Sequence, residues 1–132
     1  MQVQAVAKGI SISPRKAGLV ASLVRGRSVS DAEAILDHTP KKAAPLIKKV
    51  ILSAKANAVN NHKLKEDSLE IAQLVIGQGT AIKRYRPAAM GRALPYKRYT
   101  SHIKVVLSGD EAKPTAKKPK TANKPATKGK KG

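Results

Sequence analysis

All of the aromatic residues in this chain lie in one short basic segment, residues 82–99. They are three tyrosines, Tyr85, Tyr96 and Tyr99, and the sequence contains no Phe or Trp. Aromatic side chains carry the largest apolar area and normally pack in the core. Any fold of this chain therefore has to build its core without them. Cations that screen phosphates, combined with tyrosine rings that stack on unpaired bases, indicate RNA as the ligand.

The net charge of the chain is large, +19 over 132 residues. Residues 1–109 contain 19 basic and 6 acidic side chains, and residues 110–132 contain 8 and 2. The excess is therefore not confined to the C-terminal tail. A charge of this size destabilises a compact state by self-repulsion unless a polyanion neutralises it. We expect a polyanion-binding protein with one domain and a modest core.

Composition also argues against several classes of protein. Apolar runs stay well below the ~20 residues of a membrane-spanning helix. The first residues lack the basic and apolar regions of a secretory signal. The absence of cysteine excludes a disulfide framework and thiolate metal sites. We therefore expect an intracellular, soluble protein without a membrane partner.

Two helices are predicted near the N-terminus. Ser13 and Pro14 open the first, because serine caps free amides and proline is tolerated at the first helical position. Gly26 closes it, because glycine readily adopts the left-handed conformation. The second helix begins at one of two alternative capping boxes, Ser28 with Asp31 or Ser30 with Glu33.

The third predicted helix is the longest, from Thr39-Pro40 to about Asn60. Pro45 removes one backbone hydrogen bond and predicts a kink or a loose first turn. Lysines recur along one side of this helix. Their spacing fits either a solvated face or a phosphate-contacting face, at Lys41, Lys48 and Lys55 with Lys42 and Lys49 beside them.

Alternating apolar residues predict three strands, at residues 2–12, 68–77 and 101–108. If the last two pair, the residues between them (about 79–99) form a hairpin arm. At ~3.3 Å per residue such an arm reaches roughly 30 Å from the core, and it needs a partner to lie against. Residues 110–132 contain mostly Lys, Pro, Ala, Thr and Gly, and this composition predicts a disordered basic tail.

Catalytic chemistry has little support. The carboxylates of residues 1–109 are expected on helix surfaces and one loop, and the three histidines lack metal-ligand spacing. Gly77-Gln78-Gly79 lacks the following Gly-Lys-Ser/Thr of a phosphate-binding loop, so we interpret it as the bend into the arm. We expect no catalytic residue, no metal and no cofactor.

Basic residues supply the candidate site. Seven lie within residues 82–104 without one carboxylate, whereas an ordinary solvated surface mixes both signs. Arg15 and Lys16 stand at a helix start, where the helix dipole disfavours cations, and this placement is explained if phosphates lie nearby.

Several segments together resemble the bacterial large-ribosomal-subunit protein twenty-two family over about residues 3–108. The matching strings are ISPRK at 12–16, LVRGRSV at 23–29, TPKKAA at 39–44, SAKANAVNN at 53–61, KRYRP at 83–87, GRA at 91–93 and KRYTSHI at 97–103. The resemblance implies an α+β fold, in which a three-stranded antiparallel sheet packs on three helices and a long β-hairpin projects.

The resemblance also implies a function. Members of this family are structural constituents of the large subunit that bind several domains of 23S rRNA and support early subunit assembly. Their hairpin lines the peptide exit tunnel, and macrolides bind near its tip. The expected partners are 23S rRNA, neighbouring large-subunit proteins and the nascent polypeptide in the cytoplasmic ribosome, without a homo-oligomer.

Site residues are assigned on the matching motifs and the basic surfaces. Those expected to contact rRNA are Arg15, Lys16, Arg25, Arg27, Lys41, Lys42, Lys48, Lys49, Lys55, Lys83, Arg84, Tyr85, Arg86, Arg92, Tyr96, Lys97, Arg98, Tyr99 and His102. The expected tunnel-lining tip consists of Arg86, Pro87, Ala88, Ala89, Met90, Gly91 and Arg92.

The chain departs from the family pattern at three positions. Ala88 replaces a usual arginine, Met90 a basic or polar residue, and Tyr99 a common basic residue. The tip is less cationic as a result, so we expect anchoring mainly from the stem of the arm. The Lys-Pro-Ala-rich tail leaves one alternative function, a DNA-compacting basic protein, and a secreted membrane-active protein is disfavoured by the missing signal.

Overall fold

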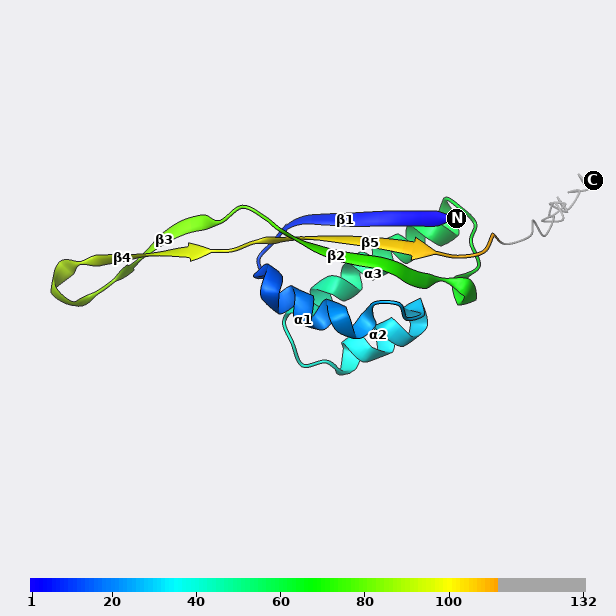
Figure 1. The fold of residues 1–132 in the computed structure, drawn as a ribbon, viewed down its shortest axis with the longest axis horizontal. Helices are drawn as coiled ribbons and strands as arrows, with labels where there is room; N and C mark the ends of the chain where they lie inside the picture. The colour runs from blue at the N-terminus through cyan, green and yellow to red at the C-terminus, as the bar shows by residue number, and fades with distance from the viewer. Residues whose placement is uncertain (112–132) are drawn as a thin grey trace, which may run out of the picture.

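The computed structural model describes residues 1–111, so the predicted tail lies almost entirely outside the described residues. Within residues 1–111, no helix is long and apolar enough to cross a membrane. The elements, shown in Figure 1, are β1 (Gln2–Ile10), α1 (Pro14–Val24), α2 (Val29–His38), α3 (Ala43–Asn60), the 3₁₀ turn η1 (Glu66–Ser68), β2 (Glu70–Gln78), β3 (Ile82–Pro87), the 3₁₀ turn η2 (Ala89–Gly91), β4 (Ala93–Arg98) and β5 (Ser101–Ser108).

The main sheet has three antiparallel strands in the order β1-β5-β2. The three helices gather on one side of it (Figure 1). The register aligns Leu107 of the central strand with Val3 on one side and Ile71 on the other. These three side chains are buried, whereas Lys104 points to the opposite, exposed face. The predicted α+β class, the three helices and the antiparallel pairing are confirmed.

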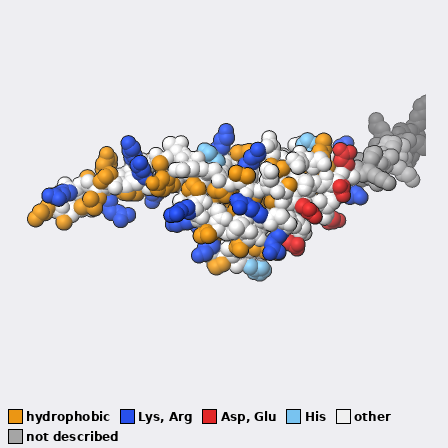
Figure 2. All heavy atoms as spheres, in the orientation of Figure 1, with side chains coloured by type: hydrophobic (Ala, Val, Ile, Leu, Met, Phe, Trp, Pro, Cys, Tyr) orange, Lys and Arg blue, Asp and Glu red, His pale blue; other side chains and the backbone are white. Residues whose placement is uncertain are grey.

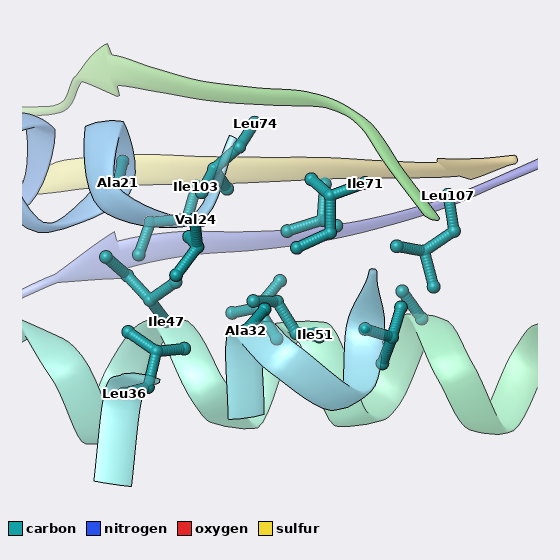
Figure 3. Close-up of a cluster of buried hydrophobic side chains, with 14 of the residues drawn as sticks. Ala21, Val24, Ala32, Leu36, Ile47, Ile51, Ile71, Leu74, Ile103 and Leu107 are labelled. Atoms are coloured by element: carbon teal, nitrogen blue, oxygen red, sulfur yellow. The ribbon is translucent and has the colours of Figure 1, made fainter. Parts of the chain in front are cut away.

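The core is aliphatic (Figure 3). Its largest fully buried hydrophobic side chains come from α1, from the start of α2, from α3, from the residue before β2, and from the sheet: Val24, Val29, Ile47, Ile51, Leu69, Ile71, Ile103, Val105 and Leu107. Each such side chain contributes about 1.5–3 kcal/mol through burial. All three tyrosines are exposed instead, by 37% to 71%. The expectation that the aromatics do not pack in the core is confirmed.

The first two helices begin as their cap residues predict. Ser13 occupies the N-cap of α1, with Pro14 at the first helical position. The hydroxyl of Ser28 accepts a hydrogen bond from the Asp31 amide (3.2 Å), which selects the first of the two alternative capping boxes for α2. Gly26 has a φ of +71°, and its amide donates to the Ile71 carbonyl of β2 (3.2 Å). The turn after α1 is therefore attached to the edge of the sheet.

The predicted start of the third helix is wrong. α3 begins at Ala43, because Thr39 terminates α2 instead of opening the next helix. The Thr39 amide donates to the Leu36 carbonyl (3.3 Å) and its hydroxyl to the Ile35 carbonyl (2.6 Å). The later start places Pro45 in the first turn, where an amide has no helical partner in any case. Proline is therefore accommodated there at little cost.

β3 and β4 form a separate two-stranded antiparallel sheet, which we call the arm (residues 82–98). Figure 1 shows it extending away from the helices. Its pairs run from Ile82 with Arg98 to Pro87 with Ala93, and every residue of both strands is exposed. A hydrogen bond from the Ala88 amide to the Arg92 carbonyl (2.8 Å) closes the tip.

A small set of contacts joins the arm to the main sheet. The Gly79 amide donates to the Thr100 carbonyl (2.8 Å), and the Thr100 hydroxyl donates to the Thr80 carbonyl (2.7 Å). A Cβ at position 79 would overlap the Thr100 hydroxyl oxygen and lie 3.2 Å from the ring of His102. Glycine is therefore favoured here, because the segments that leave and re-enter the main sheet approach closely.

We predict that Gly79→Ala lowers the free energy of unfolding by about 1–3 kcal/mol, because the added methyl overpacks this junction. Urea unfolding followed by circular dichroism measures the change. Gly77→Ala is the matched control, since a Cβ there would meet its nearest atom, the Cβ of His102, at an ordinary 3.8 Å. Equal effects of the two substitutions would contradict the packing explanation.

Candidate nucleic-acid interface

Charge is separated along the molecule. Figure 2 shows Lys and Arg side chains on the arm and around its root, and Asp and Glu side chains toward the opposite end. The topology explains which carboxylates lie together. β2 runs from Glu70, beside η1, to Gln78, next to the arm. The Lys65 amide donates to the Asp110 carbonyl (3.1 Å), which places Asp110 at the η1 end of β2 as well. Among the described residues, a polyanion is therefore attracted most strongly to the arm end.

The arm carries a high density of positive charge on only two strands. Lys83 and Lys97 stand directly opposite each other across its two strands, an arrangement that destabilises an isolated hairpin. The guanidinium of Arg86 lies 5.4 Å from the ring centre of Tyr96, within the range of a cation–π contact. Tyr85 is 71% exposed. The arm thus presents cations and ring faces that phosphates and bases are suited to engage.

Several predicted site residues converge at the root of the arm. Lys16 of α1 and the neighbouring Lys41 and Lys42 line one hollow, and Lys42 also lines a second hollow with Arg84 and Arg98. Residues far apart in the sequence therefore form one basic surface. Arg15 lies exposed in the same first turn of α1, which contains no acidic residue.

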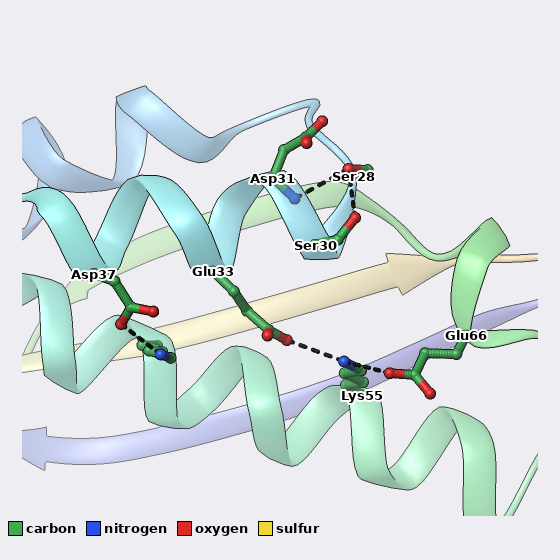
Figure 4. Close-up of polar contacts among 8 residues, drawn as sticks. Ser28, Ser30, Asp31, Glu33, Asp37, Lys55 and Glu66 are labelled. Atoms are coloured by element: carbon green, nitrogen blue, oxygen red, sulfur yellow. Dashed lines mark hydrogen bonds and ion pairs between the residues drawn. The ribbon is translucent and has the colours of Figure 1, made fainter.

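Lys48 and Lys55 lie in ion pairs instead of at the root of the arm, and Figure 4 shows Lys55 between Glu33 and Glu66. Lys48 forms an ion pair with Asp37 (2.5 Å), and Lys55 forms ion pairs with Glu33 (3.2 Å) and Glu66 (2.6 Å). The hydrogen bond that Lys55 donates to the Glu66 carboxylate is the main cause that raises the pKa of Lys55; burial opposes it, and Glu33 adds to the increase. These two lysines connect α3 to α2 and η1, whereas Lys49 is exposed.

The side chains of three other predicted residues form hydrogen bonds with backbone groups. Arg25 donates through Nε to the Leu74 carbonyl (2.9 Å), and Arg27 donates through Nε to the Leu23 carbonyl (2.9 Å). Each guanidinium has five N–H donors, so one such bond orients the group and leaves four donors for a ligand. His102 accepts a hydrogen bond at Nδ1 from the Gly9 amide (3.0 Å).

Sequence reasoning missed the uncharged part of the root surface. Ser11, Ile12, Ser13 and Leu19 line the first hollow together with the lysines. A signal was available in the sequence, because Leu19 lies off the apolar stripe that Ala17, Val20, Ala21 and Val24 form on its helix. Within residues 1–111, no group of three or more His, Cys, Asp or Glu side chains is arranged to hold a metal ion.

Comparison with known proteins identifies relatives over nearly the whole described chain. Residues 5–108 match the family model described as ribosomal protein L22p/L17e. The large ribosomal subunit protein uL22 of Clostridioides difficile (strain 630) is 51% identical over 107 residues, which cover 81% of this chain and 96% of that relative. The family resemblance deduced from the motifs is confirmed.

We predict that Lys55→Met affects stability, whereas Lys42→Met affects RNA binding. Lys55→Met should lower the free energy of unfolding by about 1 kcal/mol, because two carboxylates lose their partner, with RNA affinity nearly unchanged. Lys42→Met should leave stability unchanged and weaken RNA binding. Urea unfolding and filter binding to 23S rRNA fragments measure the two effects. A loss of affinity in Lys55→Met as large as that in Lys42→Met would contradict this assignment.

We also predict how pH affects the Lys55 ion pairs. Because folding raises the pKa of Lys55 above its ordinary value of 10.5, the stabilisation is fully present below that pH. It is lost as the pH rises through the folded-state pKa. The stability difference between the wild type and Lys55→Met should therefore shrink above pH 10.5. A difference that stays constant through this window would contradict the ion-pair explanation.

Proposed function

Because the chain belongs to the L22p/L17e family of ribosomal proteins and is a structural, non-enzymatic constituent of the large ribosomal subunit, we propose that it binds 23S rRNA through its arm and the arm's root. In this proposal it contacts several rRNA domains, lies beside other large-subunit proteins and supports early assembly of the subunit. The separation of charge along the molecule is the observation that carries the proposal.

The affinity comes mainly from phosphate contacts. Six lysines and arginines lie within residues 83–98, without one carboxylate. Neutralising rRNA phosphates releases condensed counterions, and this release relieves the repulsion between facing cations of the arm. The acidic end, near Glu66 and Glu70, stays turned away from the RNA. The protein thereby docks in one orientation, with its arm directed into the subunit.

The arm is proposed to line the peptide exit tunnel. Its tip is a tight turn in which Met90 and Gly91 adopt left-handed φ angles of 60° and 65°. Met90 is 96% exposed, and the Ala88 and Ala89 side chains beside it are small. A narrow tip with few charges fits a wall past which a nascent polypeptide moves, while the cations of the stem hold the rRNA.

We predict that deletion of residues 83–98 leaves a folded domain that no longer enters large subunits. Gln78 already pairs with Ser101 in the main sheet, so the chain can turn without the arm. Circular dichroism should show a melting temperature within a few degrees of the wild type. At ~0.7 counterions per single-strand phosphate, losing six cations should reduce the salt dependence of rRNA binding by a log–log slope of about 4.

Co-sedimentation with large subunits at moderate salt tests incorporation of the same variant. The full chain should sediment with the subunits, and duplex DNA should compete poorly for 23S rRNA fragments. An unfolded deletion variant would show that the arm belongs to the core. An unchanged salt dependence would show that the arm does not contact phosphates.

A further inference from the structure

The root of the arm contains a cleft that charge alone does not explain. A hollow of about 460 Å³ lies between the start of α1 and the segment that leads into α3. A second hollow, of about 380 Å³, lies at the base of the arm. Ser11 and Lys42 line both hollows, so the two are adjacent, and we call them together the root cleft.

The rim and the floor of the root cleft differ in chemistry. The rim carries five cations, contributed by α1, by the segment before α3 and by both strands of the arm: Lys16, Lys41, Lys42, Arg84 and Arg98. None of the described residues that line either hollow is acidic. The floor is apolar and includes Ile12, Leu19 and Val20. Cations around an aliphatic floor match a group with phosphates outside and an uncharged ring inside.

Leu19 is the most informative residue of the floor. It is 74% exposed, the most exposed apolar side chain of a helix that buries Ala17, Val20, Ala21 and Val24. Tyr99, which lines the second hollow, is 46% exposed. A base ring gains free energy by stacking on an aromatic face such as that of Tyr99, irrespective of base identity, and by covering the apolar surface of Leu19. The size of the larger hollow also falls within the range of about 300–1,000 Å³ that is usual for small-ligand pockets.

Polar groups in the root cleft add to the match. Ser13 is the N-cap of α1, but its hydroxyl makes no capping hydrogen bond. That hydroxyl and the exposed Ser11 hydroxyl both lie beside the lysines. The free amides in the first turn of α1 favour an anion at the same place. Phosphate and sugar oxygens would therefore find both charged and neutral donors.

We propose that the root cleft binds a single unpaired nucleotide extruded from the rRNA. The base lies on Ile12 and Leu19, the phosphates on either side of it lie against Lys16 and Lys42, and a neighbouring base stacks on Tyr99. The proposal rests on the proposed rRNA binding and specifies its ligand at this site. A side chain from a neighbouring protein is the less suitable occupant, because a rim of five cations matches phosphates better.

Occupation of the root cleft would also fix the direction of the arm. Lys16 and Leu19 belong to the helical layer, whereas Arg84 and Arg98 belong to the arm. One nucleotide held between them joins the two parts at their narrow junction. An extruded nucleotide would therefore serve as a fixed point from which the arm extends.

Binding of two RNA hairpins tests the proposal. One hairpin carries a single unpaired adenosine in its stem, and the other is fully paired. At equal salt, the wild-type chain should bind the bulged hairpin about tenfold more tightly, as stacking of one base allows. Leu19→Glu should reduce this ratio to about 1. Leu23→Glu is the matched control, because Leu23 is also exposed on α1 (47%) and lies outside the cleft lining.

The outcomes separate the two proposals. If the wild type binds neither hairpin, the proposed rRNA binding itself fails. If it binds both equally, or if both glutamate variants keep the ratio, the root cleft does not hold a nucleotide although rRNA binding stands. A photoreactive benzoylphenylalanine at position 19 in assembled large subunits should cross-link to rRNA. A cross-link to a ribosomal protein instead would overturn the choice of occupant. Thermal unfolding verifies that each variant is folded.

Discussion

The pairing of β2 with β5 is the constraint on which the rest of the molecule depends. The two strands are antiparallel neighbours, and Gln78 at the end of one pairs with Ser101 at the start of the other. The residues between them must therefore leave the sheet and return to it at the same end of these two strands. Gly79 and Thr100 hold the outgoing and returning segments together there. The arm extends from this closure, and every residue of its two strands is exposed.

The arm requires an external source of stability because it lacks an internal one. Its residues are exposed and its facing lysines repel each other. The domain has an internal source of stability, since its aliphatic side chains fill the space between three helices and one face of the sheet. Stability thus resides in the domain, and the proposed binding in the arm. An rRNA partner would supply the counter-charge that the arm lacks.

The distribution of carboxylates decides which cations are available. Lys55 lies between Glu33 and Glu66, and Lys48 is paired with Asp37, so α3 uses part of its positive charge to hold neighbouring elements. Lys42, at the start of the same helix, lies in the root cleft where no lining residue among those described is acidic. Similar lysines on one helix consequently serve stability at one end and the proposed RNA contact at the other.

Much of the fold was predictable because its signals are local. The alternation of Ile103, Val105 and Leu107 determined a buried strand face, and Ser13-Pro14 determined where α1 starts. The start of α3 was mispredicted because Thr39 carries the same helix-opening signature as Ser13. Its hydroxyl instead bonds to the preceding turn of α2. A local signature does not specify which of two adjacent helices a residue joins.

The sequence by itself determined that the tyrosines and a dense group of cations lie in one acid-free segment outside the core. The residue composition and the spacing of the apolar residues are enough to show this, since the core is built from the aliphatic side chains. Only the tertiary structure decided which lysines meet carboxylates and which meet the arm. It also decided that Ser11, Leu19 and Lys42 line one cleft with Arg84 and Arg98. Such contacts join residues far apart in the chain, and their distances depend on how helices, sheet and arm pack together.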